Sequence, residues 1–203
     1  MDALDPLAER ILTTFLRLIR ERGIEATTTR VLAEQAGIHE TTIFRRFSDK
    51  AALIRATYRL FAATESIQHY PLHIDTSSIE HTREGVLACV RFLATHMRQA
   101  PQLLQLGASA LWRYPQLQEE FAATPKAALA LLEAALTQAG PRLRSDVDQA
   151  ASAFALLGLI YLAVTLDSRQ WVTLSEARWE RLLSANVALL FPEQDQGTLQ
   201  EDT

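Results

Sequence analysis

The chain has 203 residues, and 24 acidic against 20 basic side chains give it a formal net charge of −4. Hydrophobic residues make up 48%, and Gly and Pro number 7 each, which excludes collagen-like, low-complexity and largely disordered proteins. Cys89 is the only cysteine, so an intrachain disulfide framework and a thiolate zinc cluster are excluded. Acidic residues precede any apolar run at the N-terminus, which argues against a signal peptide, and we expect a cytoplasmic protein.

Apolar residues recur with the period of a helix along almost the whole chain, and no stretch shows the alternation typical of a strand. The sequence therefore predicts an all-α fold. The first helix carries one apolar stripe from Leu7 to Ile19, and we expect it to end at Gly23.

Residues 27–50 carry the pattern of two short helices joined by a tight turn. The first is predicted to be capped by Thr28 and to end before Gly37, whose backbone freedom suits the turn. The second is predicted from His39 to about Phe47. This is the spacing of a helix-turn-helix, whose second helix fits the major groove of B-DNA.

The outer side of this unit is rich in Thr and Arg, and residues 1–60 hold 10 Lys and Arg against 8 Asp and Glu. Cations near helix N-termini hold phosphates, and side chains at the start of a recognition helix face base edges. A plain connector between helices is the alternative interpretation of a turn through glycine. The predicted DNA-binding residues are Thr28, Arg30, His39, Glu40, Thr41, Thr42, Phe44, Arg45, Arg46 and Lys50.

A fourth helix is predicted from Ser48 or Asp49 to about Gln68, followed by a loop over Tyr70–Ser78. We divide the chain into a DNA-binding domain (1–48), an effector-binding and dimerisation domain (49–192, with a connecting helix at 49–69) and a mobile acidic tail (193–203). Later helices are predicted from Ser77 or Thr82 to Gln99, from Pro101 to before Pro115, over Tyr114–Ala139, from near Ser145 or Asp148 to Ser168, and from Ser175 to Phe191. Within them, Thr124 and Pro125 either restart a helix or kink one.

Residues 150–166 contain no charged side chain, yet they fall short of the ~20 residues that a membrane-spanning helix needs. A helix that is apolar on all sides must be covered on all sides, so we expect a partner subunit and no membrane. The predicted dimer interface comprises Leu156, Leu159, Ile160, Leu183 and Val187.

The N-terminal region resembles the DNA-binding domain of TetR-family transcriptional regulators. The resemblance runs without gaps through Gly23, Ala26, Thr27, Thr28, Arg30, Leu32, Ala33, Ala36, Gly37, Ile38, Thr42, Ile43, Phe44, Phe47, Lys50 and Leu53. It implies a homodimer whose first three helices bind DNA and whose fourth leads to a C-terminal domain for a small molecule. The last two helices would form a four-helix bundle with the partner.

Four positions depart from the family pattern. The family usually has Tyr at position 44, whose hydroxyl contacts a phosphate, and Phe44 cannot make that bond. His is frequent where this chain has Arg46, Ser where it has His39, and Gly where it has Thr41. The operator sequence of a relative therefore does not carry over to this protein.

The second domain offers weaker signals. Candidate residues for an apolar effector pocket are Phe92, His96, Trp112, Phe121 and Tyr161, although aromatic residues at helical spacing also form ordinary cores. The histidines and the acid around residues 69–81 suggest a metal only weakly, since Pro71 interrupts them, and we predict no metal and no cofactor. No catalytic motif is present, so we predict a sequence-specific transcriptional regulator, most simply a repressor that a small apolar effector releases from a palindromic operator. The alternative is a helical small-molecule-binding or catalytic protein without DNA function.

Overall fold

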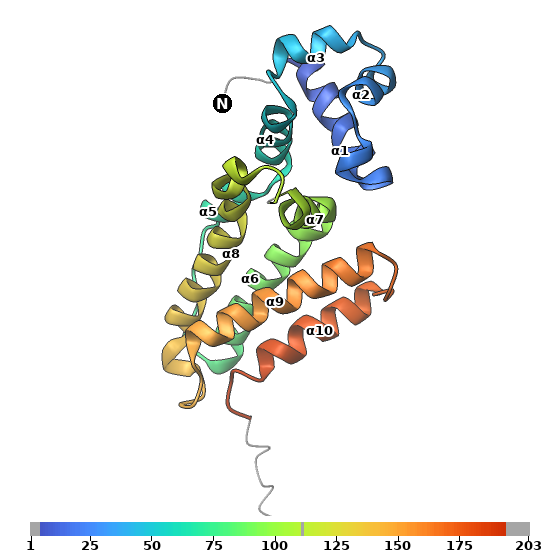
Figure 1. Ribbon diagram of the computed structural model, residues 1–203. Helices are drawn as coiled ribbons and strands as arrows, with labels where there is room; N and C mark the ends of the chain where they lie inside the picture. Colours follow the sequence, from blue (N-terminus) through green and yellow to red (C-terminus); the bar gives the residue numbers. More distant parts are fainter. Residues whose placement is uncertain (1–4, 111, 194–203) are drawn as a thin grey trace, which may run out of the picture.

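The computed structural model describes residues 5–110 and 112–193, and every regular element within them is a helix (Figure 1). The prediction of an all-α fold is confirmed. The helices are α1 (Pro6–Ala26), α2 (Thr29–Ala36), α3 (Glu40–Arg46), α4 (Lys50–Phe61), α5 (Thr64–Gln68), α6 (Ile79–Gln99), α7 (Pro101–Ala110), η1 (Pro115–Leu117), α8 (Gln118–Ala139), η2 (Gly140–Arg142), α9 (Gln149–Ser168) and α10 (Glu176–Ala188). Apart from Glu193, the predicted tail lies outside the described residues.

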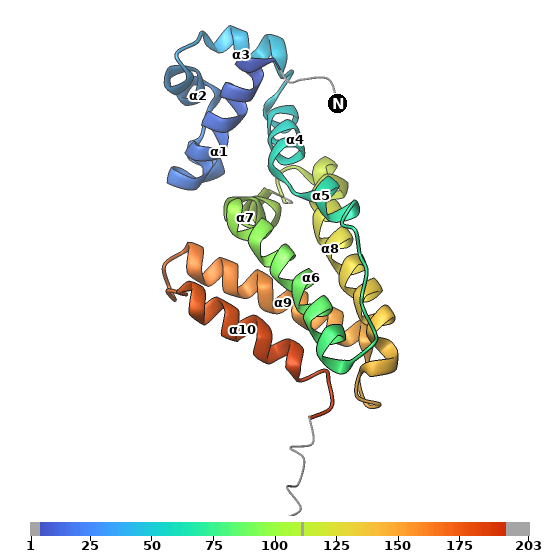
Figure 2. The same cartoon turned by 180° about the vertical axis from the view of Figure 1, so that it is seen from behind.

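The molecule is elongated, with α1, α2 and α3 at one end and α4 leading from them to the larger body (Figures 1 and 2). In that body α6 packs against α8, α9 and α10. The antiparallel helices α9 and α10 lie along one side of the body and α8 along the other. This arrangement leaves one face of α9 and α10 turned away from the rest of the chain.

Six helices begin at a side chain that accepts a backbone N–H of the first turn, as N-caps do. These caps are Asp5, Thr28, Asp49, Ser78, Asp148 and Ser175. The predicted cap Thr28 is confirmed, and Ser175, predicted to open the last helix, is the cap of α10. The helix α6 starts at Ile79 from the cap Ser78, so the start predicted at Ser77 or Thr82 was wrong by two or three residues.

The predicted connecting helix is broken in two. After α4 the backbone is extended at Ala62 (φ −73°, ψ 134°), and α5 starts in a new direction at Thr64. The break lets Ile67 of α5 pack into the core of the larger body, where it is 2% exposed. The sequence gives no local signal here, because no Gly or Pro lies at the break and burial of the second helix decides its path.

Pro125 lies inside one continuous helix, α8, and does not restart a helix. A proline has no N–H, so the carbonyl of the residue four positions earlier lacks its usual partner in the helix. In α8 that carbonyl belongs to Phe121, and it accepts a hydrogen bond from the Tyr58 hydroxyl of α4 at 3.2 Å.

The described residues form two hydrophobic cores. One lies in the larger body and contains the inner faces of α6, α8, α9 and α10. The other joins the buried faces of α1, α2, α3 and α4, with Phe15 and Leu32 fully buried, and it also takes in Leu103 and Leu106 of α7. The N-terminal unit of α1, α2 and α3 is therefore fixed to the body by α7 as well as by α4, a contact that sequence periodicity does not reveal.

Candidate nucleic-acid interface

The turn between α2 and α3 has the backbone geometry that the sequence predicts. Gly37 adopts a left-handed conformation (φ 63°, ψ 40°), and the N–H of Ile38 donates to the carbonyl of Ala33 at 3.0 Å. Ile43 of α3 is 1% exposed and lies in the same core as Leu32. These contacts fix α3 at a set angle to α2, as a helix-turn-helix requires.

The start of α3 is braced by a polar contact with α2. The Thr29 hydroxyl donates to Oε1 of Glu40 at 2.5 Å, which ties the N-termini of the two helices together. His39 occupies the cap position of α3 with an extended backbone but without a side-chain hydrogen bond. Thr28 accepts the N–H of Val31 at 3.2 Å, so its oxygen serves as the cap of α2.

The outer face of α3 carries the side chains that are free of the core. Thr41, Phe44 and Arg45 are exposed, and the Phe44 ring is 48% accessible. Thr42 is half-buried beside them. A face of this composition offers a hydroxyl, an apolar ring and a cation to a groove, and these groups contact bases, thymine methyls and phosphates.

Arg46 is paired with the carboxylate of Asp5, which also caps α1 by accepting the N–H of Leu7. That backbone hydrogen bond, with the nearby Arg46, lowers the pKa of Asp5. Asp5 was not among the predicted site residues. A phosphate approaching Arg46 would compete with an acid that is already in place.

The amino group of Lys50, predicted to contact a phosphate, is engaged inside the protein. Its Nζ donates to the carbonyl of Ile24 at 2.7 Å and so ties the start of α4 to the end of α1. Burial lowers the pKa of Lys50, while nearby Glu25 raises it and Arg113 lowers it further. The amino group therefore holds two parts of the domain together.

Replacing Lys50 by methionine is expected to lower the free energy of unfolding by about 1–2 kcal/mol, because the buried Ile24 carbonyl loses its charged donor while the apolar stem is kept. The matched control is Lys126→Met, since Lys126 is 67% exposed on α8 and pairs with the exposed Glu119. Chemical denaturation of both variants measures the difference. A Lys50→Met protein as stable as the control but weaker on DNA would restore the predicted phosphate role.

Arg45→Ala is expected to weaken binding to every duplex alike and to reduce the slope of log affinity against log salt by about 0.9, the value for one phosphate contact. Arg83→Ala, at the far end of the molecule on α6, removes the same charge and serves as the control. Fluorescence anisotropy at several salt concentrations measures both slopes. Equal slopes for Arg45→Ala and Arg83→Ala would contradict a phosphate contact at Arg45.

Among the described residues, the predicted effector residues lie in different surroundings. Phe121 is 5% exposed and packs edge-on to Tyr58, with ring centroids 5.1 Å apart. Phe92 stacks on His96 at 4.1 Å, and His96 lines a cavity of about 30 Å³ together with Tyr58 and residues of α5 and α7. That volume has room for about one water molecule.

Two further members of the predicted pocket differ sharply in exposure. Tyr161 is half-buried on α9, and burial, together with the nearby Tyr58, raises its pKa to about 12. Trp112 is 93% exposed in the loop after α7. Its place on the surface contradicts the prediction that it lines a buried pocket, because the chain turns away from the core at that point.

Most of the predicted dimer residues belong to the core of the chain itself. Leu156, Ile160, Leu183 and Val187 are at most 4% exposed, and only Leu159 is half-buried. They cannot form a surface for a partner without unfolding. Because α9 is apolar all round, its periodicity did not reveal which side packs on α6 and α8.

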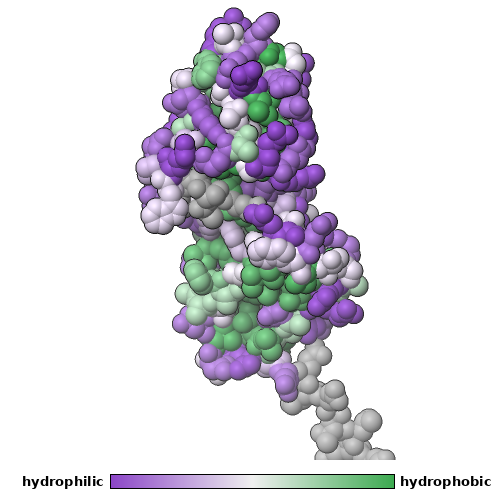
Figure 3. All heavy atoms as spheres, turned by 45° about the vertical axis from the view of Figure 1, so that its right-hand side comes forward, coloured by the Kyte–Doolittle hydropathy of each residue, from purple (hydrophilic) through white to green (hydrophobic). Residues whose placement is uncertain are grey.

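One side of α9 and α10 leaves apolar side chains exposed. Phe154 and Leu162 of α9 are 69% and 59% exposed, and Leu189 after α10 is 65% exposed. Gly158 lies between Phe154 and Leu162 in the sequence, and beyond its chain neighbours and the backbone of α9 no atom of the described residues lies within 4 Å of the position that its Cβ would take. Figure 3 shows hydrophobic side chains spread over the half of the molecule that holds these helices. By length and composition alone α9 could also cross a membrane, a test that the core helix of a soluble protein passes as well.

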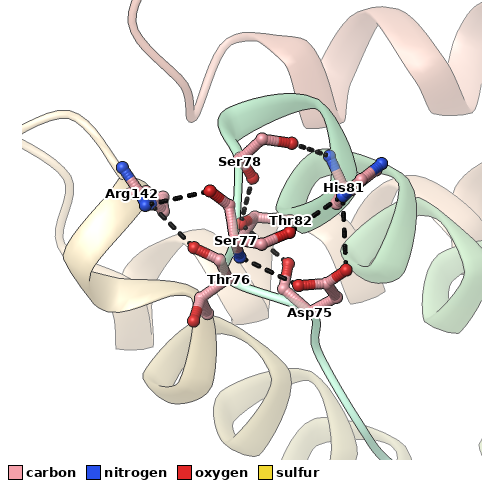
Figure 4. A network of polar contacts seen from close by, with 7 residues as sticks. All are labelled: Asp75, Thr76, Ser77, Ser78, His81, Thr82 and Arg142. Carbon is pink, nitrogen blue, oxygen red and sulfur yellow. Dashed lines mark hydrogen bonds and ion pairs between the residues drawn. The ribbon is translucent and has the colours of Figure 1, made fainter.

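The histidine-rich loop before α6 is held by hydrogen bonds and an ion pair (Figure 4). Nδ1 of His81 lies 2.9 Å from Oγ of Ser77 and 3.2 Å from a carboxylate oxygen of Asp75. Arg142 donates to the carbonyls of Thr76 and Ser77, which fastens the loop to the corner between α8 and α9. Among the described residues, no three His, Cys, Asp or Glu side chains come together as a metal site would require.

The fold and the site together define a helix-turn-helix protein: two short helices at a fixed angle, with a polar and cationic outer face on the second. Comparison with known proteins shows what this unit resembles. Residues 11–57 match the bacterial regulatory proteins of the tetR family. The uncharacterized HTH-type transcriptional regulator YvkB of Bacillus subtilis is 43% identical over 51 residues, which are 25% of this chain and 27% of that protein.

Solved structures share the whole fold. The fatty acid degradation regulator FadR from Bacillus halodurans superposes with a TM-score of 0.68 at 15% identity, over 94% of this chain and 97% of that one. A transcriptional regulator from Rhodococcus sp. Rha1 gives a TM-score of 0.70 at 14% identity, over 90% and 95%. Residues 11–57 of this chain are therefore similar to the tetR family of bacterial regulatory proteins, and the fold of the whole chain is similar to that of these solved structures.

Proposed function

We propose that the protein is a homodimeric, cytoplasmic repressor that binds a two-fold symmetric operator and leaves it when a small apolar molecule binds within residues 83–166. One observation carries the proposal: α3 stands on a rigid helix-turn-helix frame and turns Thr41, Phe44 and Arg45 outward. None of these three side chains supports the core. Their exposure is what recognition of a groove requires.

The exposed apolar side of α9 and α10 supports the dimer. Phe154, Gly158 and Leu162 follow one another at a spacing of four residues and so share a face of α9. A second copy of the same face would cover this surface under two-fold symmetry. To bind successive major grooves, such a dimer has to hold its two copies of α3 about one turn of DNA apart, ~34 Å, and the operator is then a near-palindrome.

An effector can release the protein from DNA only if one thermodynamic condition is met. The effector must bind the DNA-competent and the incompetent arrangement with different affinities, and a coupling of ~1–3 kcal/mol changes DNA affinity by about 5–150-fold. The residues that we propose to contact it are Phe92, His96, Phe121 and Tyr161. The cavity beside His96 is small, so an effector larger than a few atoms has to open it.

The experiment that tests the proposal is anisotropy titration of labelled duplexes that tile the region upstream of the protein's own gene, with random duplex as competitor. We expect one duplex to bind at least about 10³-fold tighter than random DNA at physiological salt. A thermal-shift screen of lipophilic compounds follows, and its hits are added to the complex. Equal affinity for every duplex would contradict the proposal of a transcriptional regulator and favour the alternative of a ligand-binding or catalytic protein. Compounds that stabilise the protein but never release DNA would contradict only the proposed release by an effector.

Thr41→Ala and Thr42→Ala are expected to change sequence preference, because each good base contact contributes ~1–3 kcal/mol of discrimination between bases. Thr137→Ala on α8 is the control, because Thr137 lies far along the chain and its hydroxyl donates to the carbonyl of Glu133. Selection of binding sites from a randomised duplex pool compares the three variants. Identical selected sequences for Thr41→Ala, Thr42→Ala and the control would show that α3 sits in the groove in another register.

A further inference from the structure

The contact between α4 and α8 is centred on one buried hydroxyl. The Tyr58 side chain leaves α4, is 7% exposed, and brings its Oη within 3.2 Å of both the Phe121 carbonyl and Oγ1 of Thr124. Burial raises the pKa of Tyr58, so the hydroxyl stays protonated and able to donate at neutral pH. Its ring packs edge-on to that of Phe121.

Pro125 creates the acceptor for this hydroxyl. In an unbroken helix the Phe121 carbonyl would accept the N–H of residue 125, and proline has none. A buried carbonyl that accepts no hydrogen bond lowers the stability of the fold, so an arrangement that brings a donor to the Phe121 carbonyl is favoured. Tyr58 supplies that donor from the helix that carries the DNA-binding end.

Thr124 extends the same contact across the break between α4 and α5. Its Oγ1 lies 2.6 Å from Oγ1 of Thr64, the first residue of α5, and 3.2 Å from the Tyr58 hydroxyl of α4. One hydroxyl therefore holds both sides of the break at Ala62. On the surface of the same contact, Arg55 pairs with Glu120 at 2.7 Å.

We propose that Tyr58 is a positioning residue for DNA binding: with the Phe121 carbonyl and the hydroxyls of Thr124 and Thr64 it forms a latch that fixes the angle of α4 on α8. That angle sets the distance between the two copies of α3, so the inference rests on the proposed function. The 30 Å³ cavity is lined by both Tyr58 and Thr124.

A double-mutant cycle tests the latch without DNA. Tyr58→Phe keeps the ring and leaves the Phe121 carbonyl without a donor, so we expect the unfolding equilibrium constant to rise about tenfold. Pro125→Ala supplies an N–H within α8 to the same carbonyl. In that background Tyr58→Phe should have less than about a third of its effect. Equal effects of Tyr58→Phe in the two backgrounds would overturn the latch.

Operator spacing tests its role in positioning. The wild type is used to select an operator from a randomised pool, and one base pair is then inserted between the half-sites. For each protein we compare the affinity for the original operator with the affinity for the operator that carries the insertion. We expect this ratio to be about tenfold smaller for Tyr58→Phe than for the wild type, because a freed α4 adapts to the new spacing. Tyr114→Phe, which removes a hydroxyl from a half-buried ring elsewhere, should keep the wild-type ratio. An unchanged ratio for Tyr58→Phe overturns the positioning role.

Failure of the proposed function gives a different result. If the wild type selects no operator, both the proposed regulator function and the positioning role of Tyr58 are contradicted. The double-mutant cycle of Tyr58→Phe and Pro125→Ala then still tests whether the latch exists. Nitroxide labels at Arg45→Cys and Lys126→Cys, on α3 and α8, report the same angle directly, since Cys89 is buried and escapes labelling. A distance distribution that broadens in Tyr58→Phe supports the latch, and an unchanged one overturns it.

Discussion

Phe154→Glu is expected to give a folded monomer whose operator affinity is about 10²–10⁴-fold lower, because a single half-site then binds without its linked partner. The side chain is 69% exposed on α9, so the charge disturbs nothing inside the chain. In the proposed dimer it would face the same region of the second copy, where an unpaired charge is strongly unfavourable. Light scattering and anisotropy measure the two effects.

The control for this prediction is Trp112→Glu, which places the same charge on a fully exposed aromatic residue away from α9 and α10. It should remain a dimer with wild-type affinity. Val187→Glu serves a second purpose, since Val187 is completely buried and its change should unfold the chain rather than split a dimer. A Phe154→Glu protein that stays dimeric would place the interface elsewhere.

Leu106→Ala is expected to lower the free energy of unfolding by about 2–5 kcal/mol, the range for a buried leucine replaced by alanine. Leu106 belongs to α7 yet packs in the core of the DNA-binding end, where it is 1% exposed. The destabilisation should therefore appear in α1 and α4 as well as in the body, as a single transition at lower denaturant. Hydrogen exchange of these helices measures it.

Trp112→Ala provides the matched control, because it removes a larger side chain six residues further along at a fully exposed position. Its stability should stay within about 0.5 kcal/mol of the wild type. If Leu106→Ala left the exchange of α1 and α4 unchanged, the two ends of the molecule would not share a core.

The helix-turn-helix was predictable because its signals are local. Thr28 caps α2, Gly37 takes the left-handed turn, and Ile43 alternates with exposed side chains at the helical period. Each of these features follows from a residue and its close neighbours in the chain. For the same reason the caps Asp49 and Ser175 lie where the sequence predicts them.

The remaining features depend on contacts between distant segments. The break at Ala62 has no signal of its own and exists because Ile67 is buried against the body. The role of Lys50 became visible only with the Ile24 carbonyl in place, and that of Pro125 only with Tyr58 in place. A fully apolar helix such as α9 likewise carries no information on which face packs inward.

The most direct test of the central claim is selection of binding sites by the purified full-length protein from a randomised duplex pool. We predict a two-fold symmetric consensus with half-sites about one helical turn apart, and the disappearance of that consensus when Thr41 and Thr42 are both replaced by alanine. A pool that stays random after selection at physiological salt, from protein that is folded and dimeric, would contradict the claim.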